Sequence, residues 1–248
     1  MQTNRHHINS SYLRREVVVD TRFTGTSPSV LLLVNDGQDL AGLLPENPGT
    51  SVLIAGIHAG THRRAEYGTA GVLDHQGQGA AAENYTRFII RELLPFLQQQ
   101  YRNMPLTKRA FAGFSLGGLS ALDITWHYPD VFHLAGVFSG ALWWRSKPLG
   151  KGYQDDKDRI MHRLIRAGGY HAGQQFFFEC GTADETADRN NNGVIDSIDD
   201  TRDLIKDLLL KGYKPDKDIF YLEIPGGRHD AATWKTAMGV FLQLPFFH

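Results

Sequence analysis

The fold that this sequence predicts is decided by the stretch Ala112-Gly113-Phe114-Ser115-Leu116-Gly117-Gly118. It matches the pattern G-x-S-x-G, with the serine at its centre. A short apolar run precedes it, and residues 119–126 after it have the apolar spacing of a helix. The pattern therefore predicts a sharp strand-to-helix turn, which lifts the serine hydroxyl clear of a sheet. Such a turn needs neighbours with almost no side chain, and the three glycines supply them.

The composition indicates an ordinary globular protein. The 248 residues fit one α/β domain over 1–248 better than two small domains. Apolar residues make up 42% of the chain, enough for a sizeable core. The formal net charge of −1 gives no global field that would attract nucleic acid or anionic lipid. A single cysteine, Cys180, leaves no intrachain disulfide, and its apolar surroundings predict a small buried strand residue.

The N-terminal residues carry no apolar stretch of the kind that a signal peptide requires. No apolar run approaches the length of a transmembrane helix, so we expect no insertion into a membrane. As written, the chain is expected to be cytoplasmic, or periplasmic or secreted if a leader was removed. The sequence gives no indication of the oligomeric state.

Strand and helix signals alternate along the chain, which favours a mostly parallel central sheet with helices on both faces. An uninterrupted apolar run such as 29–34 is typical of a strand that is covered on both sides. Apolar or alternating runs predict strands at 15–20, 29–34, 51–57, 109–112, 132–138, 176–180 and 219–224.

Helical spacing predicts an amphipathic helix over 85–97, in which Pro95 should cause a kink or a break. The segment 141–174 is expected to be a short, cap-like excursion instead of a large lid. Further helices are predicted at 119–128, 155–166, 200–211 and 231–244.

A serine hydroxyl needs an adjacent base to act as a nucleophile at neutral pH. In hydrolases that carry their serine on such a strand-to-helix turn, the acid and then the histidine follow the serine along the chain, each in a loop after a strand. His229 fits the base, because it lies in a glycine-rich loop after the last predicted strand. Asp184 fits the acid after the strand before it, with Glu185 and Asp188 as alternatives. A loop histidine and a surface carboxylate without a role are the simpler interpretations.

An oxyanion hole needs two backbone N–H groups. One should come from Leu116, directly after the serine. The Gln38 N–H is the candidate for the other, in the turn Asn35-Asp36-Gly37-Gln38-Asp39 after an apolar strand. An ordinary β-turn would explain the same residues.

A second pattern indicates calcium. Residues 188–199 match an EF-hand loop, with Asp or Asn at positions 1, 3 and 5, glycine at 6 and carboxylates at 9 and 12. Position 12 is Asp where Glu is usual, and no helix is predicted before the loop, which resembles the dockerin-type variant. A turn stabilised by Asx hydrogen bonds is the alternative. The expected ligands of this structural ion are Asp188, Asn190, Asn192, Val194, Asp196 and Asp199.

Other residues indicate substrate contacts or support for loops. Trp143 and Trp144 follow a strand near the expected mouth of the site, where they could line a substrate pocket or belong to the core. An Arg63–Glu66 pair would brace the loop after the third strand.

These motifs resemble the esterase family of the α/β-hydrolase superfamily. Its members include siderophore, feruloyl and acetyl xylan esterases, S-formylglutathione hydrolase and mycolyltransferases. The resemblance covers most of the chain and lies in residues 32–38, 63–67, 92–96, 112–118, 139–144 and 227–230, with Trp234 beyond them. It implies an α/β-hydrolase fold and a carboxylesterase with Ser115, an acid near Asp184 and His229. The paired tryptophans look most like the siderophore-esterase branch.

The resulting hypothesis is a serine carboxylesterase that acts on a small-molecule or carbohydrate-linked ester through an acyl-enzyme. The same residues would serve an acyltransferase of the mycolyltransferase type. A non-catalytic module that binds carbohydrate or a partner on this scaffold is a third possibility, which the intact order of serine, acid and histidine disfavours. No organic cofactor is expected.

Overall fold

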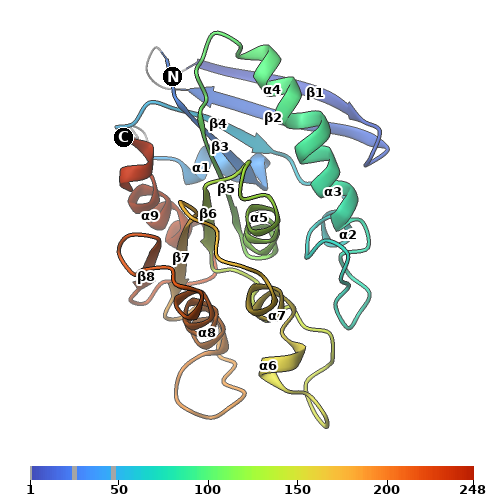
Figure 1. Cartoon of the computed structure of the whole chain (residues 1–248), viewed down its shortest axis with the longest axis vertical. Helices are drawn as coiled ribbons and strands as arrows, with labels where there is room; N and C mark the ends of the chain where they lie inside the picture. The colour runs from blue at the N-terminus through green and yellow to red at the C-terminus, as the bar shows by residue number, and fades with distance from the viewer. Residues whose placement is uncertain (1, 24–26, 46–48) are drawn as a thin grey trace.

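The structure, a computed structural model, describes residues 2–23, 27–45 and 49–248. Its centre is one twisted sheet with the strand order β1-β2-β4-β3-β5-β6-β7-β8 (Figure 1). β2 runs antiparallel to both of its neighbours, and every other neighbouring pair is parallel. The strands are β1 (Gln2–Ser10), β2 (Arg15–Phe23), β3 (Val30–Asn35), β4 (Val52–Ile57), β5 (Lys108–Phe114), β6 (Leu134–Phe138), β7 (Gln175–Gly181) and β8 (Ile219–Ile224).

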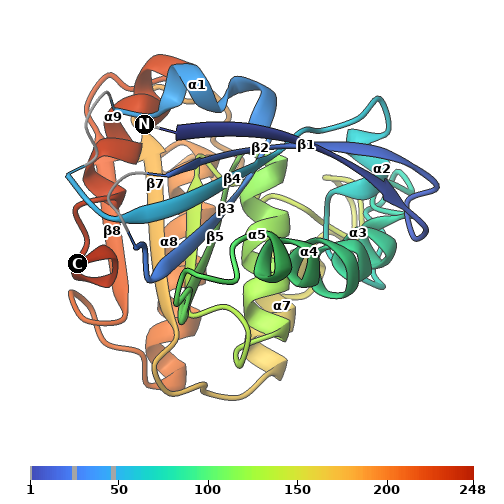
Figure 2. The same cartoon turned by 90° about the horizontal axis from the view of Figure 1, so that it is seen from above.

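Helices cover both faces of the sheet (Figure 2). One face packs on α3 (Ala82–Phe88), α4 (Leu94–Gln100), α5 (Leu116–His127), α7 (Ile160–Ala167) and α8 (Asp196–Lys211). The other packs on α1 (Leu40–Leu43), α9 (Ala231–Phe241) and the 3₁₀ turn Pro245–Phe247. Alternate residues of β3 enter the two cores, Leu31 and Leu33 on one side and Leu32 and Val34 on the other. Because both faces are buried, the strand reads as a continuous apolar run.

The predicted mostly parallel α/β sheet is confirmed, with one strand missed and one helix predicted wrongly. The N-terminal strand β1 was not predicted. The single helix expected over 155–166 is two helices, α6 (Asp155–Asp158) and α7, because Arg159 between them has an extended backbone. Its guanidinium is held by Asp200 and Asp203 of α8, at 2.6 and 2.9 Å.

Pro95 changes the helix in which it lies, as predicted. A π-helical turn, Ile89–Leu93, separates α3 from α4, and the proline lies at the start of α4. Because proline has no N–H, the carbonyl four residues before it loses its usual α-helical donor. A wider turn next to the proline is one way in which a helix accommodates that loss.

The parallel strands end at one edge of the sheet, and their loops bring the sequence motifs together. The turn at Asp36 follows β3, the serine follows β5, Ser139 follows β6, Asp184 follows β7, and His229 follows β8. The excursion 141–174 is short, as expected, and a bond from the Ile160 N–H to the Trp144 carbonyl, at 2.9 Å, joins the first residue of α7 to the beginning of the excursion.

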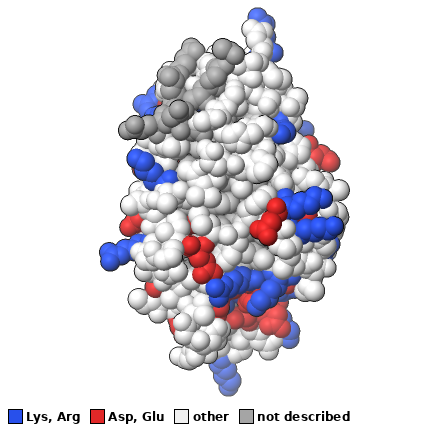
Figure 3. Space-filling view, turned by 90° about the vertical axis from the view of Figure 1, so that its left-hand side faces the viewer, with Lys and Arg blue, Asp and Glu red and all other residues white. Residues whose placement is uncertain are grey.

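Charged side chains of both signs lie on the surface. On the face shown in Figure 3, side chains of Lys and Arg are interspersed with those of Asp and Glu. Within the described ranges, no helix has both the length and the apolar character needed to cross a membrane.

Candidate active site

Ser115 lies on the predicted strand-to-helix turn, between β5 and α5. Its backbone has a φ of 54° and a ψ of −122°, a strained conformation for a residue with a side chain. The turn is possible because its neighbours lack a Cβ. A Cβ on Gly113 would lie 2.4 Å from the backbone of Gly117, and one on Gly118 would lie 2.9 Å from the Gly113 carbonyl oxygen. The Ser115 hydroxyl is thereby carried to the carboxyl edge of the sheet, half-buried.

Both predicted oxyanion donors lie at the first turn of a helix. Leu116 is the first residue of α5, and Gln38 is in the 3₁₀ turn Gly37–Asp39 that follows β3. The first N–H groups of a helix have no acceptor within it. The two turns are in contact, because the Asn35 amide donates to the Gly117 carbonyl at 2.7 Å. The Leu116 N–H directly follows the serine, and the loop that carries Gln38 contacts the residue two positions after the serine.

The loop after β3 is fixed by an ion pair that the sequence did not indicate. Arg63 donates two hydrogen bonds to Asp36, both 2.7 Å long, and its guanidinium lies over the Tyr67 ring. Glu66, the partner expected for Arg63, instead pairs with Arg15 at 2.6 Å. Arg63 and Glu66 thus anchor the loop after β4, in which they lie, to other parts of the fold, but the predicted pairing of the two with each other was wrong.

The predicted acid and base lie on neighbouring loops, and their charges affect each other. Burial raises the pKa of the Asp184 carboxyl, and His229 counteracts that rise. Desolvation lowers the pKa of His229, assisted by Arg63 and opposed by Asp184. The alternative acid Glu185 points elsewhere, because it accepts a hydrogen bond from the Ser197 N–H at 2.6 Å.

Trp234 connects the histidine to the serine turn. Its ring lies 5.1 Å from the His229 ring and 5.2 Å from the ring of Phe114, the residue before the serine. Its Nε1–H donates to the Ser139 hydroxyl at 2.9 Å. The sequence offered only one signal for this role, the position of the tryptophan five residues after the histidine, at the start of a helix.

Behind the acid lies a second carboxyl group, Glu179 on β7. This residue is 1% exposed, and both of its carboxyl oxygens are buried without a hydrogen-bond partner among the described residues. Burial and the neighbouring Asp184 raise the pKa of Glu179 to about 8. Sequence analysis overlooked it, although a carboxylate within the apolar run Phe176-Phe177-Phe178-Glu179-Cys180 is an available signal.

The two tryptophans predicted to line a substrate pocket have different surroundings. Trp144 is fully buried, packs against Gly68 and donates to Thr69 at 3.2 Å. It is therefore a core residue, and the prediction of substrate contact is corrected. Trp143 is 40% exposed, with the Arg145 guanidinium over its ring. Cys180 is buried against Thr201, as expected for a strand residue.

The loop 188–199 gathers most of the predicted calcium ligands. The amides of Asn190 and Asn192 both meet one oxygen of Asp199, at 2.9 and 2.7 Å. Asp188 accepts from the N–H of Gly193, whose φ is +84°. Asp196 is different, because its carboxylate is held by Arg189 at 3.2 Å. Among the residues that the structure describes, no three His, Cys, Asp or Glu side chains form a metal cluster.

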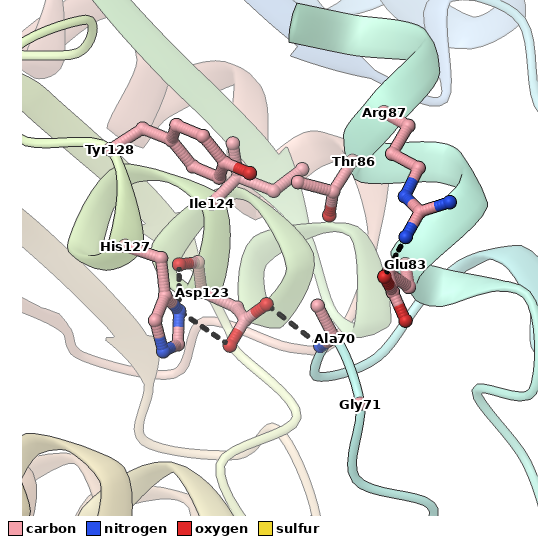
Figure 4. Close-up of a pocket in the computed structure, with 9 residues that line it drawn as sticks. All are labelled: Ala70, Gly71, Glu83, Thr86, Arg87, Asp123, Ile124, His127 and Tyr128. Atoms are coloured by element: carbon pink, nitrogen blue, oxygen red, sulfur yellow. Dashed lines mark hydrogen bonds and ion pairs between the residues drawn. The ribbon is translucent and has the colours of Figure 1, made fainter.

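A cavity of about 450 Å³ lies away from these loops, at the opposite end of α5 (Figure 4). It is bounded by α3 and by the segment around Ala70, whose N–H donates to Asp123 at 2.9 Å. His127, at the last position of α5, contacts the same aspartate. Because the serine lies before the first residue of that helix, the cavity does not belong to the candidate active site.

The twisted parallel sheet, the serine at its strand-to-helix turn and the loops at its carboxyl edge define an α/β-hydrolase. Residues 38–242 match the model of the family described as "Putative esterase", and the chain belongs to that family. The iron(III) enterobactin esterase of Escherichia coli (strain K12) is 28% identical over 166 residues, which are 64% of this chain and 36% of that protein. The chain therefore spans little more than a third of that relative's length.

Solved structures confirm the fold. The enterobactin esterase FES from Shigella flexneri, crystallised with 2,3-di-hydroxy-N-benzoyl-glycine, superposes with a TM-score of 0.72 and 21% identity, covering 98% of this chain and 58% of that one. The siderophore hydrolase EstA from Aspergillus nidulans gives a TM-score of 0.72 at 15% identity, covering 98% and 95%. The BES protein from Bacillus cereus gives 0.70 at 20% identity, covering 99% and 94%.

Proposed function

We propose that this protein hydrolyses carboxylic esters through an acyl-enzyme formed on Ser115. The observation that carries the proposal is the position of this serine, on a strained turn directly before the first N–H groups of α5. An ester carbonyl placed there can be attacked by the hydroxyl while the Leu116 and Gln38 N–H groups stabilise the oxyanion. Water would then release the acyl group by the same route.

In this mechanism His229 takes the proton of the serine and returns it to the leaving alcohol, and Asp184 stabilises the imidazolium. The lowered pKa of His229 supports the role of base, because the imidazole is then neutral at pH 7. Its ring has no hydrogen bond to the serine or to the acid across the described ranges, so the relay would tighten when substrate binds.

The substrate class is proposed from the relatives. Esters of catechol-type acyl groups are the first candidates, because an iron(III) enterobactin esterase is related to this chain. Arg63 places a guanidinium close enough to His229 to lower its pKa, and this charge would favour an acyl group with anionic oxygens.

The experiment that tests the proposal is hydrolysis of p-nitrophenyl acetate, followed by a panel of acetyl, feruloyl and catecholate esters. We expect Ser115→Ala to lower kcat by at least about 10³-fold and to abolish labelling by a fluorophosphonate probe. Ser29→Ala is the matched control, because Ser29 is exposed and lies directly before β3. Undiminished turnover by Ser115→Ala would reject the mechanism.

We also propose that residues 188–199 bind a structural calcium ion. Side chains from positions 1, 3, 5 and 12 converge, and rotation of the two asparagine amides would turn their oxygens towards the same point. Asp188, Asn190, Asn192, Asp199 and the Val194 carbonyl would hold the ion, and Asp196 would reach it only through water. The loop is tied to the acid loop by a bond from the Asp196 N–H to the Ala187 carbonyl, at 2.8 Å.

Calcium should therefore stabilise the fold. At a concentration about a hundred times the Kd, we expect Tm to rise by about 5–10 °C over the chelated protein. Asp199→Asn should reduce that rise, whereas Asp130→Asn, at an exposed position, should not. Identical melting curves of the wild type with millimolar calcium and with chelator would reject the site.

A further inference from the structure

Glu179 projects to the side of the sheet on which α9 packs. Its neighbour Cys180 points the other way, with its Sγ against Thr201 of α8. Side chains alternate along a strand, so Glu179 shares its face with Phe177, whose ring lies 5.2 Å from Phe241 of α9. Trp234, which contacts His229 and Phe114, lies on the same side of the sheet.

Glu179, Ser139 and Trp234 come together behind the proposed acid, Asp184. The Ser139 N–H donates to the Glu179 backbone carbonyl at 2.8 Å. The Ser139 hydroxyl lies near enough to both carboxyl groups to lower their pKa values, in a geometry short of a hydrogen bond. That hydroxyl already accepts the Trp234 Nε1–H, which leaves its own proton for a carboxylate. The φ of Ser139 is +43°, so the backbone is held in an unusual conformation to place it there.

The carboxyl groups of Glu179 and Asp184 share this dry environment, and all four of their oxygens are buried without a partner in the described part of the chain. Asp184 lies near enough to raise the pKa of Glu179, and two carboxylates that share a site without solvent or a hydrogen-bond donor are not both ionised. One proton between them removes the repulsion and provides the missing donor. The proton belongs on Glu179, because Asp184 is the one whose charge interacts with His229.

We propose that Glu179 and Asp184 form a carboxylic acid–carboxylate pair holding one proton, in which protonated Glu179 positions Asp184 for His229. The inference rests on the proposed function for its catalytic consequence. Glu179 is a positioning residue in this arrangement, since it acts on the base only through the acid.

The titratable groups on the elements packed around Glu179 and Asp184 do not compete for the shared proton. β6 contributes no titratable side chain, and the only one on α9 is Lys235, which is exposed. On β8, Glu223 is paired with Arg202 at 2.7 Å. Cys180 faces α8, and burial raises the pKa of its thiol, so it stays neutral. His229 and Asp230 act on Asp184, with opposite effects on its pKa.

The test compares Glu179→Leu and Glu179→Gln with the wild type in pH profiles of kcat and KM on p-nitrophenyl acetate. Glu179→Leu removes the donor and should lower kcat about tenfold or more with little change in KM. Glu179→Gln keeps a donor and should restore most of that loss. The wild type should lose activity above about pH 8, where Glu179 ionises, and Glu179→Gln should lack this decline. Glu223→Gln, on the neighbouring strand, is the control and should keep the wild-type profile.

A measurement independent of catalysis separates this inference from the proposed function. The carboxylic-acid C=O stretch in infrared difference spectra between about pH 6 and about pH 9.5 should disappear in Glu179→Gln. Unfolding gives a second readout. Because the folded-state pKa of Glu179 is raised from 4.5 to about 8, the stability of the wild type relative to Glu179→Gln should fall as pH rises through that interval.

The inference is overturned if the infrared band is absent from the wild type, or if Glu179→Gln keeps the alkaline decline. It is also overturned if Glu179→Leu, correctly folded, has the kcat of the wild type. If Ser115→Ala keeps its turnover, the proposed function is rejected, but the infrared and unfolding predictions for Glu179 still stand. Failure of the proposed function and failure of this inference are therefore distinguishable.

Discussion

Gly117 is the residue at which the serine turn touches the loop after β3. A Cβ added to it would lie 2.8 Å from a carboxylate oxygen of Asp36 and 3.0 Å from the Cβ of Asn35. Asp36 cannot yield easily, because Arg63 holds both of its carboxylate oxygens. The clash must therefore shift the turn that carries the Gln38 N–H.

We accordingly expect Gly117→Ala to lower kcat on p-nitrophenyl acetate by about 10²-fold, because a displacement of about 1 Å in a catalytic donor has that effect. Gly239→Ala is the matched control. Gly239 lies inside α9 with nothing within 4 Å of an added Cβ, so this change should stabilise the fold by about 0.5–1 kcal/mol and leave kcat unaltered. Equal activity of the two variants would contradict the role given to Gly117.

Among single residues, the sequence could predict the proposed serine, acid and base, because their order along the chain indicates their roles. The serine is marked by its glycines, and the acid and base by the loops after the last two parallel strands. Trp234, Ser139 and Glu179 could not be placed in this way, because their contacts arise only when α9 packs across β6 and β7. For the same reason the sequence could not decide between a pocket residue and a core residue for Trp144, since its burial behind the loop at Gly68 depends on tertiary packing.

Among the elements, the parallel strands were predictable because both of their faces are buried and their sequences are continuously apolar. β1 has the sequence Gln-Thr-Asn-Arg-His-His-Ile-Asn-Ser and carries no such signal. It is formed instead by pairing with β2 over nine residues, with a cross-strand ion pair from Arg5 to Asp20 and a cross-strand hydrogen bond between His7 and Glu16. The break at Arg159 had no sequence signal either, since the two aspartates that hold its side chain lie on another helix.

The polar character of β1 suggests a role as an edge strand. Exposed sheet edges recruit other chains, and charged or polar residues on them oppose this pairing. Removal of residues 1–10 would expose the edge of β2, in which Val17 and Val19 are now fully buried. We expect the truncated protein to form aggregates detectable by light scattering at concentrations where the full chain is dispersed.

A point variant separates this role from the ion pair. Arg5→Ala removes an ion pair whose arginine is exposed to solvent, so it should cost little stability and should not promote aggregation. Aggregation of Arg5→Ala to the extent of the truncated protein would assign the effect to the charge and not to the covered edge.

For the whole molecule, the architecture follows from a sheet covered on both faces, which the alternation of strand and helix signals correctly predicted. The sequence could not predict how tightly the periphery is joined to the site. Arg189, within the proposed calcium loop, is paired with Asp155 of α6 and with Asp200 of α8. The short excursion, the proposed calcium loop and the acid loop are thus connected through salt bridges and backbone hydrogen bonds, which motif spacing alone does not encode.

The left-handed backbones of Asp36, Ser115 and Ser139 have a consequence for engineering. They follow β3, β5 and β6, which are neighbours at the centre of the sheet, so unfavourable conformations gather where the chemistry is proposed. Each costs on the order of 1–3 kcal/mol, and the rest of the fold must compensate for this cost. A thermostable variant obtained by relaxing these turns would sacrifice turnover. Gains in heat resistance should be sought at the periphery, at positions such as Gly239, where stability and activity are not in conflict.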